Sequence, residues 1–100
     1  TPDYIILDEK YGITGITLLQ NYPNPFKGST TIRYNLTDNT QVALQIFTTD
    51  GREIATLVDG YEQAGSHQVS FDAVNLKNGV YLYKLTTDKS SVTKRFTLIN

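Results

Sequence analysis

The 100-residue chain contains no cysteine, and this absence excludes a disulfide framework, a thiol nucleophile and a thiolate metal site. No apolar run approaches the roughly 20 residues needed to span a bilayer, so we expect no direct membrane insertion. The formal net charge of −1 offers no basic surface, so nucleic acid is not an expected partner. The chain starts without Met and without a basic segment followed by an apolar one, so we expect a fragment that carries no signal peptide.

Residues suited to catalysis are also scarce. The only histidine, His67, stands between Ser66 and Gln68 in a predicted strand, where neighbouring side chains point to opposite faces. Ser66 and His67 therefore cannot form a catalytic dyad, and we interpret His67 as an exposed strand residue. The ten acidic residues lack the spacing of a calcium loop, although loop carboxylates that meet in space remain an alternative for weak ion binding. With no phosphate-loop pattern either, the sequence predicts neither an enzyme nor a cofactor.

The chain is rich in β-branched and aromatic residues, which favour strands. Apolar and polar residues alternate most clearly in residues 30–36. Asp50-Gly51 lies between two apolar runs and predicts a tight hairpin, and Asn78-Gly79 predicts a second turn, with both glycines at positive φ. Residues 59–65 are predicted to form a longer loop, and residues 88–90 to join the last two strands.

About seven short strands separated by polar turns predict an all-β fold, an immunoglobulin-like antiparallel β-sandwich. Residues 1–16 are interpreted as a linker or the tail of an upstream domain, and residues 17–100 as the domain itself. The expected core is formed by inward-facing apolar side chains: Leu18, Phe26, Ile32, Tyr34, Leu36, Val42, Leu44, Ile46, Leu57, Val69, Phe71, Val80, Leu82 and Leu98.

Two of the three prolines, Pro23 and Pro25, occur in the segment "NYPNPF" before the first long strand. Proline has no backbone N–H and restricts the residue before it to extended conformations, so this kink belongs at a sheet edge or a crossover. The side chains of Asn21 or Asn24 are expected to bond nearby backbone. We expect Tyr22 and Phe26 to plug one end of the sandwich, with recognition built on the shape that the kink creates.

Four stretches of the chain resemble, in order, the type A C-terminal sorting domain of the type IX (Por) secretion system. They are "LLQNYPNPFKGSTTIRYNL", "VALQIFTTDGREIATLVDG", "AGSHQVSFDAVNLKNGVYLYKL" and "VTKRFTLIN". The resemblance covers residues 17–100. The chain departs from the family at Lys27-Gly28, where Asn-Pro is frequent, and at Asn100, where a basic residue is usual.

The resemblance implies a non-catalytic secretion signal that directs a cargo protein across the outer membrane and is afterwards cleaved and replaced by a surface anchor. The implied partners are the type IX translocon and its shuttle proteins, a sortase-like peptidase, and a cargo domain N-terminal to this chain. The implied location is the periplasm in transit and then the cell surface or the medium. The recognition candidates that follow are Pro23, Asn24, Pro25, Phe26, Gly51, Gly79, Tyr81, Lys94 and Arg95.

The alternative function is an immunoglobulin-like accessory module of a secreted hydrolase, either a carbohydrate-binding module or a spacer. A row of exposed tyrosines on one sheet would favour carbohydrate binding. Tyr34, Tyr81 and Tyr83 lie in predicted strands, where a place in the core or at its rim is expected, and Tyr61 lies in a predicted loop.

Overall fold

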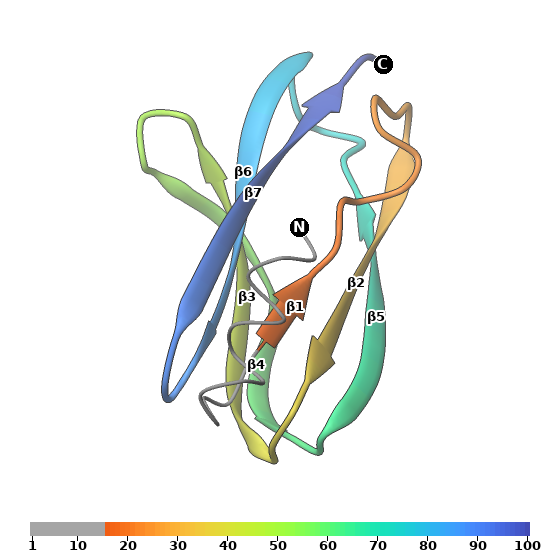
Figure 1. The fold of residues 1–100 in the computed structure, drawn as a ribbon. Coiled ribbons are helices and arrows are strands. Elements are labelled where there is room, and N and C mark those ends of the chain that lie inside the picture. The colour runs from red at the N-terminus through yellow and green to blue at the C-terminus, as the bar shows by residue number, and fades with distance from the viewer. Residues whose placement is uncertain (1–15) are drawn as a thin grey trace.

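The computed structural model describes residues 16–100, and this range contains seven strands and no helix (Figure 1). The strands are β1 (Ile16–Leu18), β2 (Ser29–Leu36), β3 (Thr40–Thr48), β4 (Glu53–Glu62), β5 (Gly65–Asp72), β6 (Gly79–Thr87) and β7 (Ser91–Leu98). They form a three-stranded sheet in the order β1-β2-β5 and a four-stranded sheet in the order β4-β3-β6-β7, with antiparallel pairing throughout. The predicted immunoglobulin-like antiparallel sandwich is confirmed.

The core lies between the two sheets because each long strand turns one apolar face inward. In β2 the inner face is formed by Ile32, Tyr34 and Leu36, and β3 alternates in the same way. The predicted core residues that are buried are Leu18, Phe26, Ile32, Tyr34, Leu36, Val42, Leu44, Ile46, Phe71 and Leu98. Leu57 and Val69 are partly buried and pack against this cluster.

Strand β6 corrects the predicted core at Val80 and Leu82. Tyr81, Tyr83 and Leu85 face inward instead, while Val80 is 43% exposed and Leu82 is only half-buried. Both faces of this strand carry apolar residues, so alternation alone could not choose between them. The face with the two aromatic rings is buried, since it removes more apolar surface from water.

The predicted hairpins are present, but the predicted loop over residues 59–65 is wrong. Strand β4 continues to Glu62 and pairs with β3 along its length, with Asp59 opposite Ala43 and Gly60 opposite Val42. Only residues 63–64 connect β4 to β5, and there the chain crosses from one sheet to the other. Backbone pairing with β3 therefore overrides the turn preference of Asp-Gly.

The strands bring their connections together at two opposite ends of the sandwich. One end contains residues 37–39, 63–64 and 88–90, and Ile16 lies there at the start of β1. The other end contains the proline kink, the connection 73–78 and the last residues of the chain (Figure 1). The predicted linker, residues 1–16, lies outside the described residues except for Ile16.

Candidate functional site

The proline kink joins the two sheets of the sandwich. Tyr22 forms a bridge with Thr31 of β2, with two backbone hydrogen bonds of 3.0 Å, and Phe26 forms a bridge with Leu98 of β7. The peptide bonds before Pro23 and Pro25 are both cis. Since the kink lies beside the edge strand of one sheet and crosses over from the other, its expected position is confirmed.

Phe26 anchors the kink in the core. Its side chain is 2% exposed, and its ring centroid lies 5.1 Å from that of Phe96. Phe96 also contacts the rings of Phe71, Tyr81 and Tyr83, so one aromatic cluster fills this part of the core. Phe26 and Tyr81 are thus structural residues beneath the surface.

Tyr22 does not plug the sandwich, because its side chain is 71% exposed. The buried residue is its neighbour Asn21, which is 2% exposed and on the opposite side of the backbone. The Asn21 Nδ2 group donates to the Pro23 carbonyl and to Thr30 Oγ1, both at 3.1 Å. Thr30 Oγ1 itself donates to the Pro23 carbonyl at 2.8 Å. The prediction that an asparagine satisfies the kink backbone is therefore confirmed at Asn21.

Tyr83 extends this buried network from the opposite sheet. Its hydroxyl accepts a hydrogen bond from the Asn21 N–H at 2.9 Å and donates one to the Leu19 carbonyl at 2.8 Å. Burial raises the pKa of Tyr83 to about 12, so the phenol stays protonated and can make both bonds at neutral pH. No local pattern indicates Tyr83 for this role, since its partners are more than 60 residues away.

Asn24 connects the kink to the closing strand. Its Oδ1 atom accepts a 2.9 Å hydrogen bond from the Thr97 N–H. Phe26 donates to the Thr97 carbonyl at 3.0 Å and accepts from the Ile99 N–H at 2.9 Å. The kink therefore covers the C-terminal part of the free edge of β7. Without the kink, this part of the edge could pair with another strand.

Asn100 joins three segments at the same end. Its Oδ1 atom accepts from the Gly28 N–H at 2.7 Å, and its Nδ2 group lies 3.4 Å from the Ala73 carbonyl. Asn78 Nδ2 donates to the Asn100 carbonyl at 3.3 Å. In the sequence Asn100 stands out only as a departure from the family, and no local pattern predicts this role.

The surface over this network carries several exposed apolar side chains. We call this surface the kinked end. Its exposed residues are Tyr22, Pro23, Asn24, Pro25, Val74 and Ile99. Val74 and Ile99 are 69% and 53% exposed, respectively. Exposed apolar side chains at one end of a domain are typical of protein-interaction sites.

The other recognition candidates divide between this end and more distant places. Gly79 starts β6 opposite Leu98, and the Tyr81 hydroxyl donates to the Lys77 carbonyl at 2.6 Å, so both support the connection 73–78. Gly51 lies in the β3–β4 hairpin, on the far side of β6 and β7 from the kink (Figure 1). Both glycines have the expected positive φ, 96° at Gly51 and 145° at Gly79.

Lys94 and Arg95 lie in the middle of β7, next to the residue that precedes the kink. Gln20 Nε2 donates to the Arg95 carbonyl at 2.8 Å and to Asn21 Oδ1 at 2.7 Å. Lys94 is half-buried and pairs with Tyr83, whereas Arg95 is exposed and pairs with Leu82. The two cations therefore point to opposite faces of the sheet. The structure brings six of the candidates to the kinked end and leaves out Gly51, Lys94 and Arg95.

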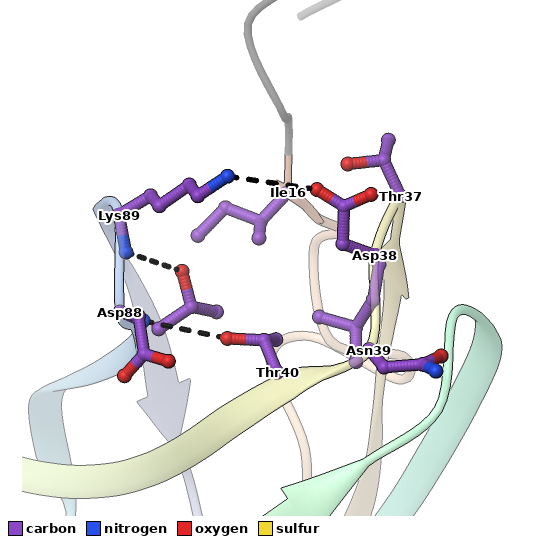
Figure 2. Close-up of a pocket in the computed structure, with 9 residues that line it drawn as sticks. Ile16, Thr37, Asp38, Asn39, Thr40, Asp88 and Lys89 are labelled. Carbon is purple, nitrogen blue, oxygen red and sulfur yellow. Dashed lines mark hydrogen bonds and ion pairs between the residues drawn. The ribbon is translucent and has the colours of Figure 1, made fainter.

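The opposite end of the sandwich holds a cavity of about 350 Å³, shown in Figure 2. It is lined by the buried Ile16 and Leu36 and by the exposed Asp38, Asp88 and Lys89, among others. Lys89 Nζ lies 4.0 Å from Asp38 Oδ2. Two loop carboxylates, Asp38 and Asp88, line this cavity, but no three acidic, histidine or cysteine side chains gather into a metal-binding group anywhere in residues 16–100.

His67 is half-buried, which corrects its interpretation as an exposed residue. It pairs with Tyr34 across β2 and β5, so both rings face inward, with centroids 5.3 Å apart. His67 Nδ1 lies 3.6 Å from Glu62 Oε1, which also accepts a 2.5 Å hydrogen bond from the Tyr34 hydroxyl. Burial, reinforced by Glu62, raises the pKa of Tyr34. Ser66 bonds to Asn35 instead, so no Ser-His dyad forms.

Residues 20–99 match the family model described as the secretion system C-terminal sorting domain. No curated protein sequence matches the chain. None of the described residues forms a helix long and apolar enough to cross a membrane.

Two solved structures show the same fold. One is dimeric latent PorU from Porphyromonas gingivalis, with 20% identity and a TM-score of 0.67 over 86% of this chain. The other is PorZ, a surface component of the type IX secretion system of the same organism, with 21% identity and a TM-score of 0.58 over 93% of this chain. The chain corresponds to only 9% and 12% of the length of those proteins, respectively.

Proposed function

Since the chain belongs to the family of secretion system C-terminal sorting domains, we propose that the type IX export machinery recognises it at the kinked end. The domain is a non-catalytic signal that directs an attached protein across the outer membrane, to the cell surface or the medium. The motif "YPNPF" that indicated the family is the segment that builds the kinked end. Its shape is fixed by both sheets.

The position of this end relative to the start of β1 is the observation that supports the proposal most strongly. The chain reaches β1 at Ile16, beside the connections 37–39 and 88–90. The exposed residues of the kink lie at the opposite end of the strands (Figure 1). A cargo domain joined before Ile16 would therefore leave the kinked end accessible to a partner.

The partners in this proposal are the translocon, its shuttle proteins and a sortase-like peptidase. The domain passes through the periplasm, and the peptidase then removes it and a surface anchor takes its place. The parent protein is a secreted hydrolase or another cargo, joined to the domain by a linker or the tail of an upstream domain before β1. Arg95, exposed on the outer face of the four-stranded sheet, adds electrostatic attraction to an acidic surface of the machinery, which raises the rate of encounter.

A fusion of the 100-residue chain to a periplasmic reporter, in a host with a type IX system, tests the proposed function. We expect the reporter at the cell surface, where added protease can reach it. In a matched strain without a functional translocon, the reporter should stay in the periplasm. A folded fusion that stays in the periplasm of the intact host would refute the sorting function and favour an accessory module.

A further inference from the structure

The outer face of the four-stranded sheet carries a row of residues with opposite charges at its two ends. Phe47 of β3 pairs with Glu53 of β4 on one side and with Leu82 of β6 on the other, and Leu82 pairs with Arg95 of β7. The row across the sheet is therefore Glu53, Phe47, Leu82 and Arg95. It places an anion at one edge, two apolar side chains in the middle and a cation at the other edge.

These side chains point away from the core. Phe47 follows the buried Ile46, and Leu82 lies between the buried Tyr81 and Tyr83, so both lie on the outer face. Glu53 and Arg95 are exposed. Arg95 has no ion-pair partner within residues 16–100. The other sheet packs against the opposite face, and no described strand covers the outer one (Figure 1).

From this row we propose that the outer face of the four-stranded sheet binds a second copy of the chain in a symmetric dimer. A two-fold axis parallel to the strands, between β3 and β6, places Glu53 opposite Arg95 of the second copy and Phe47 opposite its Leu82. The two-fold symmetry then forms the Glu53–Arg95 ion pair twice. The two ion pairs lie on either side of the apolar Phe47 and Leu82 side chains. A two-fold axis perpendicular to the strands would instead place each charge opposite its own kind.

The neighbouring rows fit the same arrangement. The next row contains Gln45 and Lys84, and the one after it Ala43 and Asp59. In the proposed dimer Lys84 faces Gln45 of the second copy. Strand β4 of the second copy lies opposite β7, so its Asp59 is placed diagonally across from Lys84. No like charges are opposed, and the aligned strands match the common packing of two sheets face to face.

The size of the face sets the expected strength of the dimer. Four strands about 4.8 Å apart and about eight residues long cover roughly 500 Å² per copy. The total of about 1,000 Å² is near the lower limit for a specific interface, so we expect weak, reversible association. Because the axis runs along the strands, both chains would enter at one end and expose their kinked ends at the other.

Sedimentation equilibrium of the purified 100-residue chain, from micromolar to millimolar concentration, tests this inference without any secretion component. The chain should dimerise, and Arg95→Glu or Glu53→Arg alone should weaken dimerisation about tenfold or more, because like charges then meet. The double variant Glu53→Arg, Arg95→Glu should restore it. A chain that stays monomeric at all concentrations would overturn the inference.

Arg33→Glu is the matched control. Arg33 is an exposed arginine in the middle of β2, on the outer face of the other sheet, so this variant should dimerise like the wild type. Circular dichroism checks that each variant is folded. If the folded double variant stays as weak as the single ones, or if Arg33→Glu weakens dimerisation equally, Glu53 and Arg95 do not meet across a two-fold axis and the proposed dimer is wrong. The result does not depend on the export function.

Discussion

The backbone N–H of Thr97 donates a 2.9 Å hydrogen bond to Oδ1 of Asn24, and this bond ties the proline kink to the closing strand. The two residues are 73 positions apart in the chain. One side chain of the family motif thus stabilises the edge of β7 while the adjacent prolines stay exposed. The segment that we propose is recognised by the export machinery therefore also stabilises the domain.

Replacing Asn24 by alanine should destabilise the domain by about 1 kcal/mol, since the Thr97 N–H loses its acceptor. In a domain of this size, such a loss lowers the melting temperature by roughly 4–8 °C. Asn75→Ala is the control, because Asn75 is exposed and makes no hydrogen bond within the described part of the chain. Equal melting temperatures for the two variants would show that the Asn24 bond contributes nothing.

Gly79→Val should cost about 1–3 kcal/mol, because Gly79 has a φ of 145° and a branched residue is strained there. A Cβ at this position would meet no atom within 4 Å, so the cost comes from the backbone alone. Gly60→Val is the matched control, since Gly60 lies in β4 without positive φ and has equally open space. The melting temperature of Gly79→Val should be well below that of Gly60→Val. The reverse order of melting temperatures would contradict this account.

Tyr83 should make the domain less stable at high pH. Its pKa is raised from 10.0 to about 12 in the folded state, so the folded protein holds the phenol proton more tightly than the unfolded chain. The resulting stability is fully present below pH 10 and is lost as the pH rises toward 12. Its size is about 2–3 kcal/mol at 1.36 kcal/mol per pH unit. Urea unfolding at a series of pH values measures it.

The variant Tyr83→Phe separates this effect from other groups that titrate at high pH. It should be less stable than the wild type at neutral pH by about 1–3 kcal/mol, because the Asn21 N–H and the Leu19 carbonyl lose their partner. The difference in free energy of unfolding between the wild type and Tyr83→Phe should narrow above pH 10. A constant difference across that range would show that Tyr83 does not carry the effect.

Reversing the charges of Lys94 and Arg95 to glutamate should leave the domain folded but hold a reporter fusion in the periplasm. The reason is the loss of attraction to an acidic surface of the export machinery. The matched control reverses Arg33 and Arg52, two exposed arginines away from β7. Normal surface delivery by the Lys94, Arg95 variant would remove the basic pair from the proposed recognition.

The strand pattern was predictable where only one face is apolar, as in β2 around Ile32 and Tyr34. It failed in β6, because Val80 and Leu82 compete with Tyr81 and Tyr83 for the inside, and only packing against the other sheet decides between two apolar faces. The loop predicted at residues 59–65 failed for a related reason, since pairing with β3 is a long-range contact.

The position of the candidate site was predictable from the sequence, but the buried hydrogen bonds that hold it were not. The prolines placed the kink at a sheet edge through their backbone geometry alone. The buried bonds from Tyr83 and Thr30 to the kink depend on how two sheets meet, which local sequence does not determine. The prediction that Tyr22 packs inside with Phe26 is wrong, because the kink turns Phe26 into the core and leaves Tyr22 exposed.

The most direct test of the kinked end compares two tyrosines with almost the same exposure, Tyr22 at 71% and Tyr61 at 69%. Tyr22 lies in the kink and Tyr61 in β4, so replacing each by serine removes the same side chain from two different surfaces. The measurement is the fraction of a reporter fusion delivered to the cell surface. We predict a several-fold loss for Tyr22→Ser, with an unchanged melting temperature, and normal delivery for Tyr61→Ser. Equal delivery by the two variants would contradict recognition at the kinked end.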